Sequence, residues 1–129
     1  MHLNLATVLL TFAAIYSALP ACTAQYTGDA TFDNFGLEAC GAYSSGSDYV
    51  VRVAAPTFDS YPGAGSNPNQ NPICFKHINV NYQGRSVDVT IVGRCADCPG
   101  ANLELTPAAF DVLADPSVGR LYGVQWNYE

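Results

Sequence analysis

The sequence predicts a small, mainly β domain with one short helix and two disulfides, and three observations lead to this fold class. Short apolar or alternating runs, typical of β-strands, dominate the chain after its N-terminal segment. Only one stretch has the caps and spacing of a helix. Four cysteines remain when the N-terminal apolar segment is set aside, and an even number is typical of small disulfide-linked secreted domains.

Length and charge exclude several classes of function. A chain of 129 residues has room for one domain. The formal charge of -6 argues against nucleic acid as a partner, because neutralising phosphates needs clustered Lys and Arg. The same sign argues against anionic membrane surfaces. With 12% charged residues, the chain has a polar but weakly charged surface that suits a neutral polymer. We expect a monomer.

The first segment is predicted to be a secretory signal peptide over residues 1–24, which leaves 25–129 as the folded domain. Leu5–Leu19 is an apolar run too short to span a bilayer, and small residues follow it. A competing interpretation is a lipoprotein box that ends at Cys22. Pro20 within that box, and the lack of Lys or Arg before the run, count against it. We therefore expect an extracellular protein.

Removal of the signal leaves four cysteines, at positions 40, 74, 95 and 98. They allow two disulfides in three connectivities, among which the spacing does not decide. Cys95 and Cys98 have a spacing that also occurs in zinc and redox motifs. However, only one such pair exists, and His77 is the only histidine of the predicted mature chain. No metal or other cofactor is expected.

Three strands in the middle of the chain follow from its apolar pattern. Tyr49–Ala54 is a short apolar, β-branched run. Lys76–Tyr82 and Arg85–Val92 alternate apolar and polar residues. Between these two runs, Gln83-Gly84 predicts a tight hairpin turn.

The last strand is predicted at Leu121–Tyr128, with Trp126 as an aromatic anchor of the core. We expect one face of this strand to carry Tyr122, Val124, Trp126 and Tyr128.

The one helix is predicted at about residues 106–115. Thr106 occupies the N-cap and Pro107 the first helical position. Phe110 and Leu113 supply the apolar face that packs inward.

Pro56–Pro72 is rich in Gly, Pro, Asn and Ser and is predicted to be a loop, long enough to be a functional surface or a variable insertion. Phe58 and Tyr61 lie within it. With Tyr43, these aromatic side chains are candidates for stacking on sugar rings. The alternative, that they only cover the ends of a small β domain, stays open.

Four segments of the predicted mature chain resemble, in order, the motifs of one family. They are Ala30–Asp33 with Glu38–Gly41, Asn71–Lys76, Val92–Cys98 with Asn102–Phe110, and Gly119–Tyr128. Together they are similar to the double-psi β-barrel of expansins, barwin-like proteins and the rare lipoprotein A domain. The resemblance covers nearly all of the mature chain and implies a six-stranded barrel. The single short domain is most similar to the fungal loosenins, which are small expansin-related proteins.

The resemblance also implies a disulfide pairing and a site. By analogy with barwin-type barrels, Cys40 would bridge to Cys95, which leaves Cys74–Cys98. Hydrolytic relatives use two Asp residues across a groove; here one of these positions is Gly93, which cannot ionise, and the other is Glu104. We therefore expect binding without catalysis.

The predicted polysaccharide-binding groove contains Thr31, Asp33, Tyr43 and Glu104. Leu103 and Leu105 are expected to face inward, which leaves Glu104 facing the groove. Alternatively, Glu104 only favours the positive end of the following helix. We expect Asp97 and Asp88 to be solvated surface charges. No Ser/His/Asp or Cys/His set predicts a nucleophile.

The predicted function is that of a secreted, non-hydrolytic protein that binds and loosens cell-wall polysaccharide, such as cellulose or chitin. One alternative is a protein-binding module, such as an inhibitor of papain-type cysteine proteases or a barwin-like effector, with the Pro56–Pro72 loop as its contact surface. A second alternative is a weak glycosidase or lytic enzyme, in which Glu104 would pair with Asp33 or Asp97.

Overall fold

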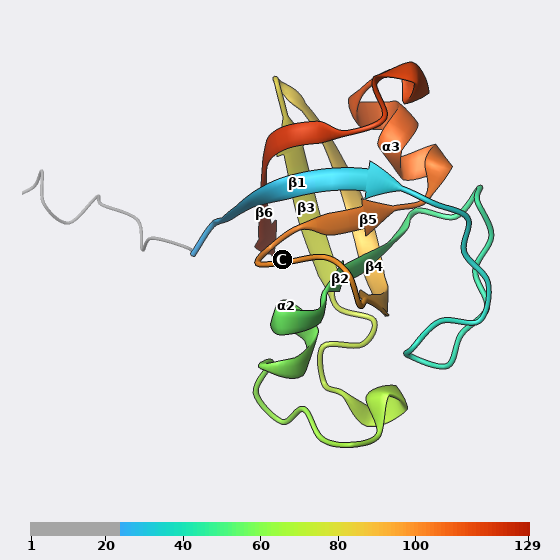
Figure 1. Cartoon of the computed structure of the whole chain (residues 1–129), viewed down its shortest axis with the longest axis vertical. Coiled ribbons are helices and arrows are strands. Elements are labelled where there is room, and N and C mark those ends of the chain that lie inside the picture. The colour runs from blue at the N-terminus through green and yellow to red at the C-terminus, as the bar shows by residue number, and fades with distance from the viewer. Residues whose placement is uncertain (1–23) are drawn as a thin grey trace, which may run out of the picture.

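The computed structural model describes residues 24–129, whose strands close into a barrel (Figure 1). The predicted signal peptide, up to residue 23, and the lipoprotein alternative at Cys22 lie outside the described residues. Within residues 24–129, no helix is both long enough and apolar enough to cross a membrane.

Six strands make up the barrel: β1 (Tyr26–Phe32), β2 (Val50–Ala54), β3 (His77–Tyr82), β4 (Arg85–Cys95), β5 (Leu103–Leu105) and β6 (Leu121–Tyr128). Around the barrel their order is β1-β5-β2-β4-β3-β6, and β6 pairs with β1 to close it. β1 pairs with β5 in parallel, as does β2 with β4, and the other neighbours are antiparallel. The six-stranded, mainly β architecture confirms the predicted fold class.

The hairpin of β3 and β4 follows the alternation of the sequence. Ile78 and Val80 on β3, like Val89 on β4, are fully buried, while the residues between them face outward. Gln83 and Gly84 both have positive φ, 47° and 83°, as a two-residue turn of this kind requires.

Two short α-helices cover the barrel rather than the one predicted. α3 (Pro107–Leu113) confirms the predicted helix, and Phe110 and Leu113 pack inward. α2 (Ala55–Asp59) lies within the segment predicted to be a loop. The sequence pattern does not predict α2, because this helix has only five residues and Pro56 lies in its first turn. Phe58 of α2 is buried in the core, with 3% of its surface exposed, and is not available to a ligand.

The core has Trp126 at its centre, as predicted. Its ring is fully buried and stacks on Tyr26 with 4.4 Å between centroids, and its Nε1–H donates to the Ala101 carbonyl at 2.9 Å. The predicted face of β6 is wrong at Tyr122, which is 71% exposed while Leu121 is buried. Gly123, with φ of 73°, lies at an irregularity in the β1–β6 pairing, which reverses the alternation there.

The disulfides pair differently from the analogy with barwin-type barrels. The bonds are Cys40–Cys74 and Cys95–Cys98, not Cys40–Cys95 and Cys74–Cys98. Backbone hydrogen bonds explain the first pair: the N–H of Cys40 donates to Val92 and that of Phe75 to Ile91, so both segments lie beside the same part of β4. For the second pair, a turn brings Cys98 N–H to the Cys95 carbonyl at 3.3 Å.

Candidate functional site

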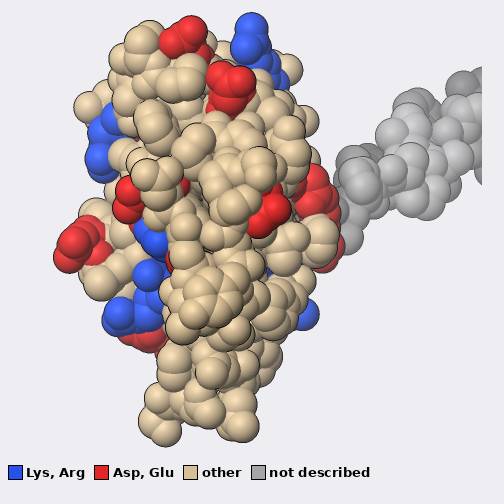
Figure 2. Space-filling model, turned by 90° about the vertical axis from the view of Figure 1, so that its right-hand side faces the viewer, with Lys and Arg blue, Asp and Glu red and all other residues tan. Residues whose placement is uncertain are grey.

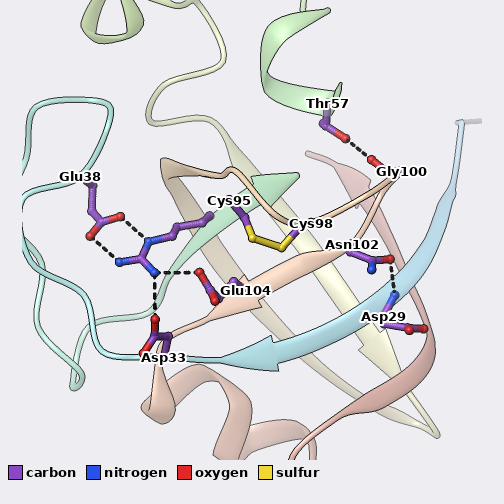
Figure 3. Close-up of a disulfide and its surroundings, with 10 residues drawn as sticks. Asp29, Asp33, Glu38, Thr57, Cys95, Cys98, Gly100, Asn102 and Glu104 are labelled. Carbon is purple, nitrogen blue, oxygen red and sulfur yellow. Dashed lines mark hydrogen bonds and ion pairs between the residues drawn. A yellow bond between two sulfur atoms is a disulfide. The ribbon is translucent and has the colours of Figure 1, made fainter. Parts of the chain in front are cut away.

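A polar groove of about 430 Å³ crosses the outside of the barrel where β1, β5 and β2 lie side by side. The Cys95–Cys98 disulfide and its turn form one wall (Figure 3). Its lining includes the polar side chains of Thr31, Asp33, Arg52, Arg94, Asn102 and Glu104.

Strand register aligns three of these side chains in a row across the groove. Thr31 on β1 is paired with Glu104 on β5, and Glu104 is paired with Arg52 on β2. Leu103 and Leu105, on either side of Glu104, are buried. Alternation along β5 therefore turns Glu104 outward, as predicted.

Arg52 holds three carboxylates at the end of the groove. Its Nε donates to Glu38 Oε1 at 2.6 Å, its Nη2 to Glu38 Oε2 at 3.0 Å and its Nη1 to Glu104 Oε1 at 2.7 Å. A longer contact of 3.4 Å joins Nη1 to Asp33 Oδ2. Figure 3 shows Glu38, Glu104 and Asp33 converging on this point from three different segments. The Phe35 ring lies 4.1 Å from the guanidinium carbon and adds a cation–π contact.

The buried member of this network, Glu38, stays ionised. Burial alone would raise its pKa, but hydrogen bonds from Arg52 and from the Gly36 N–H outweigh that effect and hold the pKa below its usual value. Hydrogen bonds to Glu38 and Glu104 in turn raise the pKa of Arg52. Glu38 and Arg52 therefore form a charge pair at neutral pH.

Gly93 explains why Glu38 fits where it does. A Cβ on residue 93 would lie 2.6 Å from Glu38 Oε1 and 2.9 Å from Arg52 Cγ, closer than real atoms approach. The space that a side chain at position 93 would fill is therefore taken by the carboxylate of Glu38, which comes from another segment. Both oxygens of the Glu38 carboxylate accept hydrogen bonds from Arg52.

A second network stiffens the other end of the groove. Asn102 accepts a hydrogen bond from the Asp29 N–H at 2.9 Å (Figure 3). Arg120 binds the Asp29 carboxylate at 3.1 Å. Arg94, on the rim, forms a bidentate ion pair with Asp59 of α2. The groove thus presents donors and acceptors in fixed positions.

The structure brings three of the four predicted groove residues together. Thr31, Asp33 and Glu104 line the groove, whereas Tyr43 lies outside it on a loop with 80% of its surface exposed. Asp97, expected to be only solvated, also lines it.

Sequence reasoning missed Arg52 and Glu38. One signal for Arg52 was available: it is the one charged residue in the apolar run Tyr49–Ala54, so it needed a partner. No group of His, Cys, Asp and Glu within the groove, as far as residues 24–129 show, is gathered closely enough to hold a metal ion.

A larger and more apolar pocket, about 700 Å³, lies on the other side of the turn at residues 98–102. Tyr26, Tyr61 and Tyr128 line it together with Pro56 and Pro62. The rings of Tyr61 and Tyr128 are 5.7 Å apart, and burial raises the pKa of Tyr128 to about 12. Of the three aromatic candidates, Tyr61 lines this pocket, Tyr43 is exposed on a loop and Phe58 is buried.

Comparison with known proteins places this geometry in context. No family model matches the chain. A homologue of the allergen Asp f 7 from Arthroderma benhamiae is 30% identical over 128 residues, which are 88% of this chain but only 42% of that protein. The papain inhibitor of Streptomyces mobaraensis is 30% identical over 107 residues, 81% of this chain and 71% of the inhibitor.

Solved structures agree with these relatives. The Streptomyces papain inhibitor superposes with a TM-score of 0.74 at 29% identity and covers 81% of this chain and 94% of its own. An expansin of Clavibacter michiganensis, solved in complex with cellohexaose, has a TM-score of 0.66 at 19% identity over 82% of this chain and half of its own. The expansin match confirms the predicted double-psi fold, while the specific likeness to loosenins stays a prediction. By sequence and by structure, the chain belongs to the family of the Streptomyces papain inhibitor, on a barrel fold shared with expansins.

Proposed function

We propose that this protein is secreted and binds a neutral cell-wall polysaccharide along the groove without cleaving it. The observation that carries this proposal is that Arg52 binds both Glu38 and Glu104, at 2.6 Å and 2.7 Å. The groove therefore offers fixed hydrogen-bonding groups, and Glu104 is held by Arg52 rather than left free to act as an acid.

Hydrolysis needs a carboxylic acid that gives up a proton and a second carboxylate that works with it. Glu38 is buried and keeps its charge because of Arg52, so it does not protonate a leaving group. Glu104, and Asp33 more loosely, share the same guanidinium. This arrangement argues against the weak glycosidase that would pair Glu104 with Asp33.

Sugar hydroxyls both donate and accept hydrogen bonds, and the groove supplies partners of both kinds. Thr31 offers a hydroxyl, Arg94 offers donors and Glu104 accepts. A glycan held in this way would exchange hydrogen bonds with a neighbouring glycan for bonds with the protein, which loosens the wall without breaking a covalent bond. The solved complex of an expansin with cellohexaose supports a glycan as the ligand of this fold.

The proposal is tested with the mature chain on insoluble cellulose and chitin. We expect depletion of the protein from solution with no release of reducing sugar. Thr31→Val and Glu104→Gln should each weaken depletion, while Asp111→Asn, which changes an exposed acid on α3, should not. Release of oligosaccharide, or full binding by both groove variants, would refute it.

A second candidate function is inhibition of a papain-type cysteine protease, and family membership favours it. The surface we propose for it is the lobe of residues 55–75, which projects from one end of the barrel in Figure 1. Residues 60–75 contain no charged side chain, and the lower end of the molecule in Figure 2 is accordingly free of red and blue. Such an uncharged projection fits an apolar protease cleft.

The lobe is also held in shape before any partner binds. Asn71 is buried and joins two parts of it: its side chain donates to the Phe58 carbonyl at 2.8 Å and accepts from the Ile73 N–H at 3.0 Å. The Cys40–Cys74 disulfide anchors the C-terminal end of the lobe, at Cys74. A loop that is already ordered loses less entropy on binding.

Titration against papain separates the two functions. Stoichiometric inhibition without glycan depletion would establish the inhibitor and remove the polysaccharide proposal. In that case Asn71→Ala, which loosens the lobe, should weaken inhibition, and Glu104→Gln should leave it unchanged. Inhibition that follows Glu104 rather than Asn71 would contradict the lobe as the contact surface.

A further inference from the structure

His77, Asp88 and Glu129 form a compact cluster on the outside of the barrel, away from the groove. His77 begins β3, Asp88 lies on β4, and Glu129 follows β6. In the barrel order, β3 lies opposite β5, the strand that carries the middle of the groove. The cluster and the groove are therefore on opposite walls.

The strands determine the geometry of the cluster. His77 is paired with Thr90, and Asn79 with Asp88, so His77 and Asp88 are diagonal neighbours on adjacent strands. His77 Nδ1 lies 2.7 Å from Asp88 Oδ1. The N–H of Glu129 donates to the His77 carbonyl at 3.1 Å, which holds the end of β6 against the start of β3.

We propose that these three side chains form a binding site for a divalent transition-metal ion of the zinc type. One imidazole nitrogen and two carboxylate oxygens, one from each residue, lie within 4.8 Å of one another. Zinc accepts nitrogen and carboxylate ligands at about 2.0–2.2 Å, so small side-chain rotations close this set around an ion. All three residues are exposed, which leaves a coordination position open to water.

Electrostatics favour a cation here. Two carboxylates stand beside each other in a protein of formal charge -6, and their mutual repulsion is relieved by a positive ion. The imidazole distinguishes the cluster from an ordinary acidic patch, because it selects zinc-like ions over calcium or magnesium, which prefer oxygen ligands. Thr90 Oγ1, 3.4 Å from His77 Nε2, adds a polar neighbour that orients the ring.

A bound ion would connect β4, β3 and the segment after β6. It would hold Glu129, the last residue described, to the centre of this wall. The consequence is a metal-dependent rise in thermal stability that is independent of any ligand in the groove.

The test uses the mature chain and zinc ions alone as the probe. We expect calorimetry to give one equivalent of Zn²⁺, and imidazole NMR signals of His77 to shift in the same titration. Loss of an outer-sphere partner alone costs about 10–100-fold in metal affinity, so loss of a ligand in His77→Ala or Glu129→Gln should cost at least that. Both side chains are exposed, so the variants should fold like the parent, and Asp111→Asn is the matched control for removal of one surface acid.

Two results would overturn the site. One is the absence of any shift at His77 when zinc is added. The other is zinc binding of undiminished affinity in His77→Ala. Neither result bears on the groove, because polysaccharide depletion is measured without metal and depends on residues of the opposite wall.

Discussion

Gly93 and Glu38 occupy one small space: a Cβ on residue 93 would lie 2.6 Å from Glu38 Oε1. Glycine at 93 is thus the condition for Glu38 to reach Arg52. The space beside Gly93 is therefore filled by an internal ion pair between Glu38 and Arg52.

Gly93→Asp should therefore destabilise the protein and bring no hydrolysis. The new side chain meets both Glu38 and Arg52, and overpacking of this kind costs about 1–3 kcal/mol. Urea unfolding measures the loss. Gly65→Ala is the matched control, since nothing lies within 4 Å of a Cβ at that position. A Gly93→Asp variant as stable as the parent would show that Glu38 moves away freely.

Arg52→Ala should be among the most destabilising single changes. It leaves Glu38, whose side chain is 4% exposed, without its cation, and breaking a buried pair from one side costs about 3–5 kcal/mol. Arg52→Ala combined with Glu38→Gln should recover part of the loss, because the unpaired charge is gone. Arg94→Ala, which breaks an exposed pair with Asp59, should change the free energy of unfolding little. Equal effects of the two arginines would contradict the network described here.

Acid should weaken the protein through Glu38. Its pKa is lower in the folded state than the usual 4.5, so its contribution to stability is complete above that value and disappears as the pH falls through the folded pKa. Unfolding curves recorded between about pH 7 and pH 3 should show a shallower decline for Glu38→Gln than for the parent. Parallel declines in the two proteins would show that other carboxylates dominate.

The two disulfides should contribute unequally. Cys40–Cys74 closes a loop with a sequence separation of 34, and Cys95–Cys98 one with a separation of 3. Restriction of the unfolded chain predicts about 4 kcal/mol for the first bond and about 2 kcal/mol for the second. Replacing each pair by serine and measuring urea unfolding checks the order.

For glycan binding, we expect loss of the Cys95–Cys98 disulfide to matter more than loss of Cys40–Cys74, the reverse of the order for stability. Cys95 and Cys98 line the groove and Cys40 and Cys74 do not, so the Cys95→Ser, Cys98→Ser double variant should lose more depletion on cellulose or chitin than the other. A groove that binds equally well without its disulfide wall would argue against this position of the glycan.

Much of the fold was predictable because its strands alternate. Arg85–Val92 and Lys76–Tyr82 have one face buried, so hydrophobic period and burial coincide. β5 has only three residues, and a run of that length has no measurable period. α2 was missed because its five residues are also too few to show a helical period. The side of β6 that carries Tyr122 was predicted wrongly, because the irregularity at Gly123 reverses the alternation there. A glycine alone does not predict a bulge.

The site was less predictable because it depends on partners that are distant in sequence. Glu104 could be placed from its two buried neighbours. Arg52 and Glu38, by contrast, are 14 residues apart and meet only because the segment between them folds back on itself. No local sequence pattern specifies that contact. The predicted disulfide pairing was wrong because it, too, depends on contacts between distant segments, namely on which segments lie beside β4.

The closed barrel limits how a protein partner can be recognised. Each of the six strands has a neighbour on both sides, so among residues 24–129 the barrel has no open sheet edge to which an extended peptide could add as another strand. A protease, or any other protein, must instead be engaged by side chains and loops. The same closure removes the usual starting point for edge-to-edge aggregation, which is an advantage for a protein expected to work outside the cell.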